Sequence, residues 1–432
     1  MALEKIRGRK PTAGNNAVIV GAGRSGRASA ELLSREGVKV RLLEKNPFAI
    51  TEAEKKAFSD KGIDVIIGEH ENAHFFGADF IIPSPAMPIS ALEKYLQNTS
   101  SEILSEMELA WRFLDNEPVL AVTGTSGKTT TASLAAAMLK AQNYTVFLGG
   151  NIGTPLSEYI LSGRKADVLV LEVSSFQLQG CSTFCPRVGI LLNISPNHLD
   201  YHRDMAEYTE AKFRLFRCQD EGDLAIFGPK LEGVAERYPI KARKIWLSDE
   251  NRFPGMKLLG KHNQLNAEAA WQGVKFFGVS LENATRAAEL FPPLPHRLEI
   301  VGEKNGATFI NDSKCTTISS LKVALEAMKR PVRLLCGGKF KGGDPRELNS
   351  LIREKTVEVG LFGANRDVFE KAWSGLVPIS WSANLEEAVN RLYLNSRPGD
   401  VILLSPATAS YDLYKNYEQR GDDFRRIVAE LK

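Results

Sequence analysis

Two glycine-rich turns, each between an apolar run and a stretch that favours a helix, constrain the fold most strongly. The first is Gly-x-Gly-x-x-Gly at residues 21–26, after an apolar run at 17–20. The second is Gly-Thr-Ser-Gly-Lys-Thr-Thr at residues 124–130, after an apolar run at 119–122. Strand, glycine turn and helix in succession form the basic unit of parallel α/β sheets. We therefore predict α/β domains with parallel sheets.

Further β-rich runs alternate with helical stretches along nearly the whole chain. Additional strands are predicted at residues 38–43, 65–67, 80–82, 167–171, 188–194, 224–227, 308–311, 332–336, 358–362 and 401–404. Helices are predicted up to residues 35 and 142, and over 205–218 and 266–277. This pattern is typical of α/β folds.

The segment Phe291-Pro-Pro-Leu-Pro295 is the clearest linker, because it combines several strong loop signals. We predict three domains. They are an N-terminal Rossmann-like domain at residues 1–106, a central P-loop domain at 107–294 and a C-terminal Rossmann-like domain at 295–432. Ligands are expected at the carboxyl ends of the strands.

Charge and composition favour small-molecule partners. The 55 Lys and Arg residues nearly balance the 52 Asp and Glu residues, which argues against a polybasic nucleic-acid binder. No apolar run approaches the ~18 residues of a membrane span, and residues 1–16 lack the apolar region of a secretory signal. The five cysteines are irregularly spaced, which argues against a disulfide framework. We expect a cytoplasmic monomer.

The second glycine turn predicts a phosphate-binding loop. Its backbone N–H groups can surround an anion, Lys128 can reach the terminal phosphates and the Thr129 hydroxyl can bind Mg²⁺. Val122 stands where the general P-loop pattern has glycine, which indicates a tighter loop. Glu172 ends a nearby apolar strand, where P-loop proteins place an acidic metal ligand. A solvated carboxylate is the alternative interpretation.

The first glycine turn, with Glu44 at the end of the next strand, fits a dinucleotide-binding fingerprint. A nicotinamide-dependent oxidoreductase with an accessory ATPase domain is therefore one alternative, and a P-loop regulatory switch is another. His198 follows a predicted strand and is either a ligand or a surface residue. Spacing alone makes Lys212 an exposed lysine whose alkyl chain lies along the surface.

Together these segments resemble the Mur ligase family, ATP-dependent enzymes that build the peptide of peptidoglycan. The shared segments are residues 124–130, the run from Asn193 to His198, Gly260-Lys-His-Asn263-x-x-Asn266 and Leu294-Pro-His-Arg297. Residues 171–178, 311–316, 404–410 and 416–421 resemble the members that add D-glutamate to UDP-N-acetylmuramoyl-L-alanine (UDP-MurNAc-L-Ala). The resemblance extends through all three predicted domains. Folylpolyglutamate synthase shares the central domain but differs at 311–316 and 416–421.

The resemblance implies three substrates, two magnesium ions and a CO₂-derived carbamate on Lys212. The first glycine turn would hold the UDP part, not a nicotinamide. The implied ATP residues are Gly124, Thr125, Ser126, Gly127, Lys128, Thr129, Thr130, Asn266, Arg297, Asp312 and Lys314. The implied UDP-substrate residues are Arg24, Ser25, Glu44, Lys45, Ser84, Asn151 and His198. The implied metal ligands are Thr129, Glu172, His198 and Lys212; the implied catalytic residues are Lys128, Glu172, His198 and Lys212.

D-Glutamate carries two carboxylates and an amine, so its pocket requires cations and hydroxyls. The residues that match this pocket in the resemblance are Thr316, Lys341, Ser410 and Tyr417. The chain departs from the family pattern at Cys315, Phe340 and Tyr417, and at Ala86 in the loop of the predicted UDP-substrate site. None of these departures removes a charge that glutamate binding requires.

Overall fold

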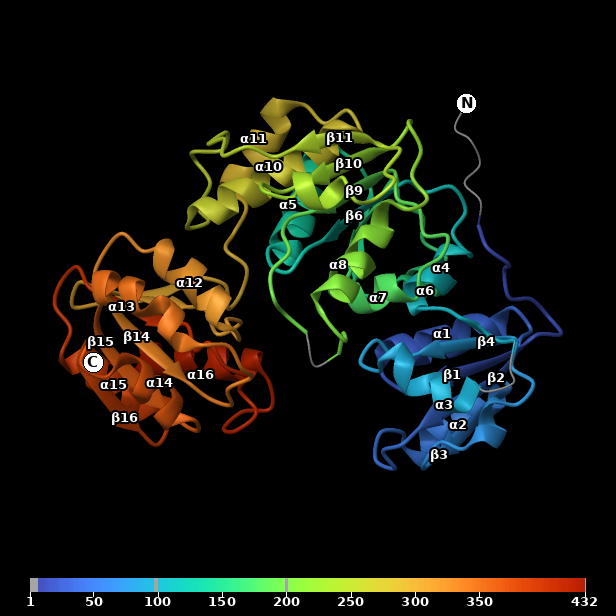
Figure 1. The fold of residues 1–432 in the computed structure, drawn as a ribbon, viewed down its shortest axis with the longest axis horizontal. Helices are drawn as coiled ribbons and strands as arrows, with labels where there is room; N and C mark the ends of the chain where they lie inside the picture. The colour runs from blue at the N-terminus through green and yellow to red at the C-terminus, as the bar shows by residue number, and fades with distance from the viewer. Residues whose placement is uncertain (1–6, 97–99, 199–200, 432) are drawn as a thin grey trace. The chain divides into compact units, whose positions relative to one another are not determined.

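The computed structural model describes residues 7–96, 100–198 and 201–431. The chain forms two compact units (Figure 1). The first comprises Met1–Phe253 and Leu265–Ala288, and the second comprises Pro254–Gln264 and Glu289–Lys432. The first unit contains two β-sheets and the second contains one. Each of the three sheets lies within one of the three predicted domains. The exact boundaries between these domains stay predictions.

The first sheet has the strand order β3-β2-β1-β4-β5, with all strands parallel. Its strands are β1 (Asn16–Val20), β2 (Lys39–Glu44), β3 (Ile63–Ile67), β4 (Phe80–Pro83) and β5 (Glu102–Ile103). The helices of this region are α1 (Arg24–Arg35), α2 (Glu52–Asp60), α3 (Glu93–Leu96) and α4 (Glu106–Trp111). Leu32 and Leu33 of α1 join Ile19 and Leu42 in one buried cluster, which holds the helix against the sheet.

The second sheet has the order β11-β10-β9-β6-β8-β7 and is also parallel. Its strands are β6 (Val119–Thr123), β7 (Val146–Gly150), β8 (Val168–Glu172), β9 (Val188–Leu191), β10 (Leu224–Phe227) and β11 (Arg243–Trp246). The helices here are α5 (Lys128–Ala141), α6 (Leu156–Ser162), α7 (Ser175–Gln179), α8 (Met205–Phe213), α9 (Glu232–Ala235), α10 (Lys261–Lys275) and α11 (Leu281–Leu290). The apolar β6, β8 and β9 are fully buried, as expected for central parallel strands.

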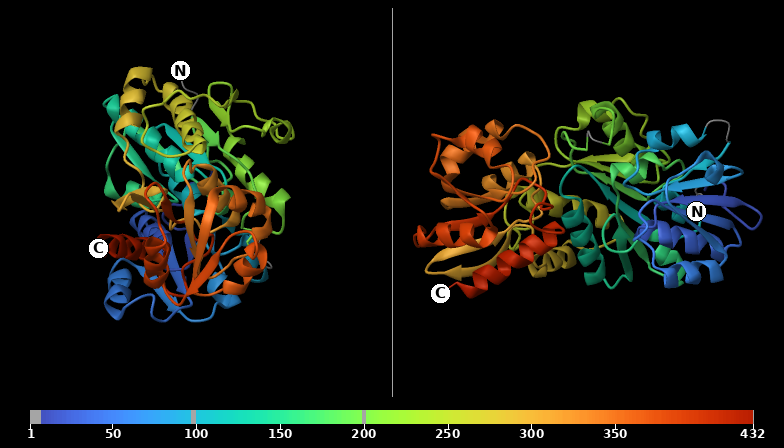
Figure 2. Two further views of the ribbon diagram at one scale, coloured as in Figure 1. Left: turned by 90° about the vertical axis from the view of Figure 1, so that its left-hand side faces the viewer. Right: turned by 90° about the horizontal axis from the view of Figure 1, so that it is seen from below.

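The third sheet has the order β12-β13-β17-β14-β15-β16; only the β12–β13 pair is antiparallel. Its strands are β12 (Glu299–Lys304), β13 (Ala307–Asn311), β14 (Val332–Gly337), β15 (Thr356–Phe362), β16 (Ile379–Ser382) and β17 (Val401–Leu404). Its helices are α12 (Ile318–Glu326), α13 (Asn349–Lys355), α14 (Arg366–Trp373), α15 (Leu385–Leu394) and α16 (Tyr417–Glu430). Leu334 packs in the cluster with α12–α14 and Leu335 in the cluster with α15 and α16, so helices cover both faces (Figure 2).

Every strand predicted from the sequence is present, but five additional strands are not among those predictions. They are β5, β7, β11, β12 and β16. The predicted helix over 205–218 ends earlier, at Phe213, and continues as a short 3₁₀ turn, while the helix predicted from 266 begins at Lys261. No helix in the described ranges is long and apolar enough to cross a membrane.

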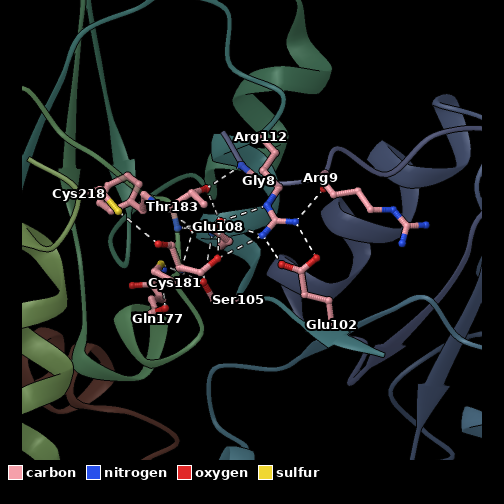
Figure 3. A network of polar contacts seen from close by, with 12 residues as sticks. Gly8, Arg9, Glu102, Ser105, Glu108, Arg112, Gln177, Cys181, Thr183 and Cys218 are labelled. Carbon is pink, nitrogen blue, oxygen red and sulfur yellow. Dashed lines mark hydrogen bonds and ion pairs between the residues drawn. The ribbon is translucent and has the colours of Figure 1, made fainter. Parts of the chain in front are cut away.

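A polar network around a buried ion pair connects the two sheets of the first unit (Figure 3). Glu108 and Arg112 both have fully buried side chains, and the Arg112 Nε donates to Glu108 Oε1 at 3.1 Å. Arg112 also donates to Glu102 in β5, at 3.0 Å to Oε2, and to the Arg9 carbonyl at 2.7 Å. The Glu108 carboxylate accepts backbone N–H bonds from Ser182, Thr183 and Phe184. These contacts fix the edge of the first sheet against the second.

We expect Glu108→Gln to lower the free energy of unfolding by about 3–5 kcal/mol, because it leaves the Arg112 charge without its buried partner. Denaturant unfolding followed by circular dichroism measures the change. Lys61→Gln, which removes the exposed Lys61–Glu31 pair, is the control and should leave the unfolding midpoint unchanged. Equal midpoints for Glu108→Gln and the wild type would contradict a stabilising role for the network.

Candidate functional site

The P-loop connects β6 to α5 in the order that the sequence predicts. Helix α5 begins at Lys128 and carries Thr129 and Thr130 in its first turn. Gly127 has a φ of +87°, and a Cβ atom built on it would lie 2.5 Å from Oδ1 of Asn266. Only glycine fits this turn without a shift of its neighbour. Asn266, a predicted nucleotide residue, therefore lies directly against the loop.

The segment after β9 holds the P-loop in place. Asn193 Oδ1 accepts from Ser126 N at 2.9 Å, and its Nδ2 donates to Ser126 O at 3.1 Å. Thr125 Oγ1 accepts from Ser195 N at 3.0 Å and lies 3.0 Å from the Tyr208 hydroxyl. Asn193, Ser195 and Tyr208 are positioning residues to which the sequence assigned no role. The sequence pointed to Asn193 only through its place in a segment shared with the family.

Glu172 is the last residue of β8, and its side chain contacts Asn151 from the loop that follows the adjacent strand β7. Its side chain is only 2 % exposed, so the interpretation as a solvated carboxylate is wrong. Oε1 accepts from Asn151 Nδ2 at 2.8 Å, whereas Oε2 is buried without a hydrogen-bond partner in the described part of the chain. A buried, unsatisfied carboxylate oxygen is costly and fits a bound cation. Mg²⁺ commonly takes one or two carboxylates together with substrate phosphates.

Lys212 is buried beside the P-loop, at 1 % exposure; the spacing-based interpretation as an exposed lysine is wrong. Its Nζ donates to Gly124 O at 3.0 Å, and Lys128 Nζ donates to the same carbonyl at 2.9 Å. Burial and the Lys128 charge hold the pKa of Lys212 well below its usual value, while Glu172 acts in the opposite direction. These surroundings therefore favour the neutral amine more than water does.

His198 lies in an aromatic cluster near the same edge of the sheet. Its ring packs edge-on against Phe176 at 4.8 Å between centroids, and Tyr201 packs on Phe176 at 4.0 Å. The Tyr201 hydroxyl donates to Met87 O at 3.0 Å. The cluster thus connects the loop after β9 with the loop after β4. Across the residues that the structure describes, no group of three or more His, Cys, Asp and Glu forms a metal cluster.

The first glycine turn packs closely against its surroundings. A Cβ atom on Gly26 would lie 2.0 Å from Gly21 O, and one on Gly21 would lie 2.9 Å from Ser84 Cβ. Ser84 therefore lies against the turn, and its assignment to the UDP substrate stays a prediction. Glu44 Oε2 accepts from Ala22 N at 2.7 Å, so this carboxylate is bonded to the turn itself.

Two further residues predicted for the UDP part, Lys45 and Arg24, form ion pairs within the protein. Lys45 forms an exposed ion pair with Glu69 at 2.8 Å. Ser25 is half-buried in the first turn of α1. Arg24 forms an ion pair with Glu158 at 2.7 Å, a contact that the sequence did not predict.

The predicted nucleotide residues of the second unit gather at the carboxyl ends of its strands. Asp312 follows β13, accepts from Ser405 Oγ at 2.8 Å and from Leu298 N at 3.3 Å. Burial raises the pKa of Asp312 to about 7, against the opposing effects of these hydrogen bonds and of the Arg297 charge. Arg297 and Asp312 are therefore electrostatic neighbours within this unit.

The residues predicted for D-glutamate surround the same end of the third sheet. Lys314 Nζ lies 5.0 Å from the centre of the Tyr417 ring, and Lys341 Nζ lies 5.9 Å from that of Tyr411. Ser410 is 3 % exposed and its carbonyl accepts from the Tyr414 N–H. Thr316 is half-buried just after Cys315. These residues and those around the P-loop form two groups, one in each unit.

Arg420 is a fully buried residue that sequence analysis missed. Its guanidinium donates to Ser313 O at 2.8 Å and to Thr408 O at 3.0 Å. These bonds hold the segments that carry Lys314 and Ser410. Arg420 lies in the family-like segment 416–421, but its spacing gave no indication of burial.

Models of known protein families match the central and the C-terminal parts of the chain. The model of the Mur ligase middle domain matches residues 122–246, and that of the Mur ligase, glutamate ligase domain, matches residues 296–408. The UDP-N-acetylmuramoylalanine–D-glutamate ligase of Desulfovibrio desulfuricans is 64 % identical, with 100 % of each chain covered. The enzyme of the same name from Geotalea uraniireducens is 35 % identical, covering 96 % of this chain and 97 % of the relative.

Solved structures share the fold at lower identity. The UDP-N-acetylmuramate-alanine ligase of Thermotoga maritima matches with a TM-score of 0.59 and 18 % identity, over 96 % of this chain and 100 % of that one. A MurF ligase from the same organism, solved in complex with ADP, matches with a TM-score of 0.59 and 20 % identity, over 89 % and 96 % of the two chains. The fold, both domain matches and full-length identity agree: the chain belongs to the Mur ligase family, among the UDP-N-acetylmuramoylalanine–D-glutamate ligases.

Proposed function

We propose that this ATP-dependent ligase joins the alanyl carboxylate of UDP-MurNAc-L-Ala to the amine of D-glutamate, in peptidoglycan precursor synthesis. ATP is split to ADP and phosphate. The observation that carries this proposal is the group formed at the P-loop by half-buried Lys128 and by Glu172 and Lys212, which are both buried. The chain also has full-length D-glutamate ligase relatives. The cytoplasmic location and the monomeric state stay predictions.

ATP would bind at the P-loop, where backbone N–H groups at the start of α5 can surround its phosphates. Lys128 would offset the charge that develops on the transferred phosphoryl group, and Asn266 would contact the nucleotide beside Gly127. We assign Arg297, Asp312 and Lys314 to ATP as well. Ser25, Glu44, Lys45, Ser84, Asn151 and His198 are assigned to the UDP substrate, and Thr316, Lys341, Ser410 and Tyr417 to D-glutamate.

We assign one magnesium ion to Thr129 and Glu172, and a second to Glu172, His198 and a carbamate on Lys212. The unsatisfied Oε2 of Glu172 supports this assignment. Magnesium would neutralise phosphate and carboxylate charge, so that the two anions can approach. The neutral Lys212 amine would add to the carbon of CO₂ and release one proton, which leaves an anionic carbamate. The low pKa of the buried amine supports this step.

The chemistry would proceed in two transfers. The alanyl carboxylate attacks the γ-phosphorus of ATP, which forms an acyl phosphate and releases ADP. The neutral amine of D-glutamate then attacks the acyl carbon, phosphate leaves with the electrons of the C–O bond, and the nitrogen loses one proton to solvent or to the departing phosphate as the amide forms. An acyl phosphate is needed because a free carboxylate has no adequate leaving group.

The acyl phosphate predicts a definite oxygen transfer. If the alanyl carboxylate of the substrate carries oxygen-18, one labelled oxygen should appear in each released phosphate. Mass spectrometry of the phosphate measures the label, and unlabelled substrate in oxygen-18 water is the control. Unlabelled phosphate from labelled substrate would rule out the acyl phosphate.

We expect Lys212→Ala to lower kcat for ligation by at least about 10²-fold, the usual scale for losing one key electrostatic group. Equilibration with carbon-13 CO₂ should give a carbamate NMR signal in the wild type that is absent from the variant. Lys241→Ala, an exposed lysine of the same unit, should retain both activity and signal. Wild-type turnover in Lys212→Ala would refute the carbamate.

Asp312 should impose a pH dependence on ATP binding. Because its pKa is raised to about 7, the carboxyl is ionised above that pH and protonated below it, and only the ionised form is a strong acceptor for hydroxyl donors. We expect KM for ATP to rise about fivefold from pH ~8 to pH ~6. Asp312→Asn should have a higher KM with a flatter profile. Identical profiles for both proteins would contradict this role.

A further inference from the structure

Arg24 lies within the first glycine turn and is the first residue of α1, yet its side chain extends to the loop between β7 and α6. Its Nη1 donates to Gly153 O at 2.6 Å. Its Nε and Nη2 each donate to one oxygen of Glu158, both at 2.7 Å. Arginine is suited to this bidentate geometry, because its planar guanidinium matches a carboxylate. The pair therefore joins the first sheet's glycine turn to the second sheet's loop.

The loop that Arg24 contacts, residues 151–155, carries Asn151. Asn151 in turn donates to Glu172 through both its side chain and its backbone N–H, at 2.8 Å each. A continuous series of polar contacts thus runs from Glu158 through Arg24 to this loop and then to Glu172. It connects the predicted UDP site with the predicted metal carboxylate.

Glu158 is the member of the pair that lies on α6, and this helix is fixed by buried contacts. Ser157, next to Glu158, donates its N–H to the buried Glu106 at 2.6 Å. Helices α1 and α6 also pack against each other. By contrast, the side chains of Arg24 and Glu158 are 57 % and 32 % exposed. Such an exposed pair adds little to folding stability, so its main effect should be on the position of the loop.

We propose that Glu158 is a positioning residue for the UDP substrate and acts through Arg24. Glu158 fixes the Arg24 guanidinium, and Arg24 holds the loop of Asn151 in its binding position through the Gly153 carbonyl. The family resemblance implies that Arg24 belongs to the UDP-substrate site; in this proposal it acts there as a positioning residue and not as a direct substrate contact. This inference rests on the proposed function, in which the first glycine turn and Asn151 hold UDP-MurNAc-L-Ala.

A double-mutant cycle tests the proposal with Arg24→Gln, Glu158→Gln and the combined variant, all free of new charges. Calorimetry measures Kd for UDP-MurNAc-L-Ala without ATP, and steady-state assays give kcat and KM for ATP. We expect each single variant to raise Kd about threefold to tenfold. The combined variant should be no worse than the poorer single variant, while kcat and KM for ATP stay within about twofold.

The pair between Glu31 of α1 and Lys61 provides a matched control. It has similar exposure, 36 % and 51 %, and a similar distance of 2.8 Å, but lies within the first sheet's region. Glu31→Gln and Lys61→Gln should leave Kd unchanged. Unchanged melting temperatures in all variants would separate positioning from a loss of folding.

Each of four results would overturn the proposal. Multiplying effects in the combined variant would mean that Arg24 contacts the substrate directly. A lower Kd in Glu158→Gln would mean that Glu158 competes with the diphosphate for Arg24. An unchanged Kd in Glu158→Gln would remove its role. Failure of the wild type to bind the UDP substrate would overturn this inference and the proposed function together, whereas binding without ligation would refute only the latter.

Discussion

The parallel pairing of β9, β6, β8 and β7 is the constraint on which the first unit's site depends. Val122 of β6 pairs with Glu172 of β8, and Gly150 of β7 pairs with the same residue. Because parallel strands end at one edge, the segments that follow them meet there. The P-loop, Glu172, the loop of Asn151 and the segment of Asn193 and His198 therefore come together, although they are far apart in the sequence.

Burial at this edge determines the electrostatics. The chain has a formal net charge of only +3, but Lys128 and Lys212 donate to the same carbonyl and Glu172 has an unsatisfied oxygen. In a region of low dielectric these few charges interact strongly. Their arrangement fits anionic substrates and cations that bridge them, which the near-neutral composition could not indicate.

The family relationship also removes the alternative of a nicotinamide-dependent oxidoreductase, because the chain belongs to a family of ligases.

Local sequence patterns predicted the strands and turns that depend on a few neighbouring residues. They did not predict edge strands or buried side chains, which depend on tertiary packing. The apolar β6 and β8 and the two glycine turns were predictable because strand burial and turn geometry are encoded within a few residues. Strand β12 was missed because it lies at a sheet edge with exposed and half-buried residues only. The burial of Lys212 was not predictable from α8, since it depends on which face of the helix meets the P-loop. Arg420 was missed because its burial depends on the contacts of α16 with the segments of Ser313 and Thr408, which are distant in the sequence.

The amino-acid dependence of phosphate release from ATP tests the central claim most directly. Purified protein is mixed with ATP, Mg²⁺ and UDP-MurNAc-L-Ala, and D-glutamate, L-glutamate, L-lysine or meso-diaminopimelate is added. The account predicts sustained phosphate release with D-glutamate alone, in equal amount to the amide formed. Sustained release without any amino acid, or equal release with L-glutamate or L-lysine, would contradict it.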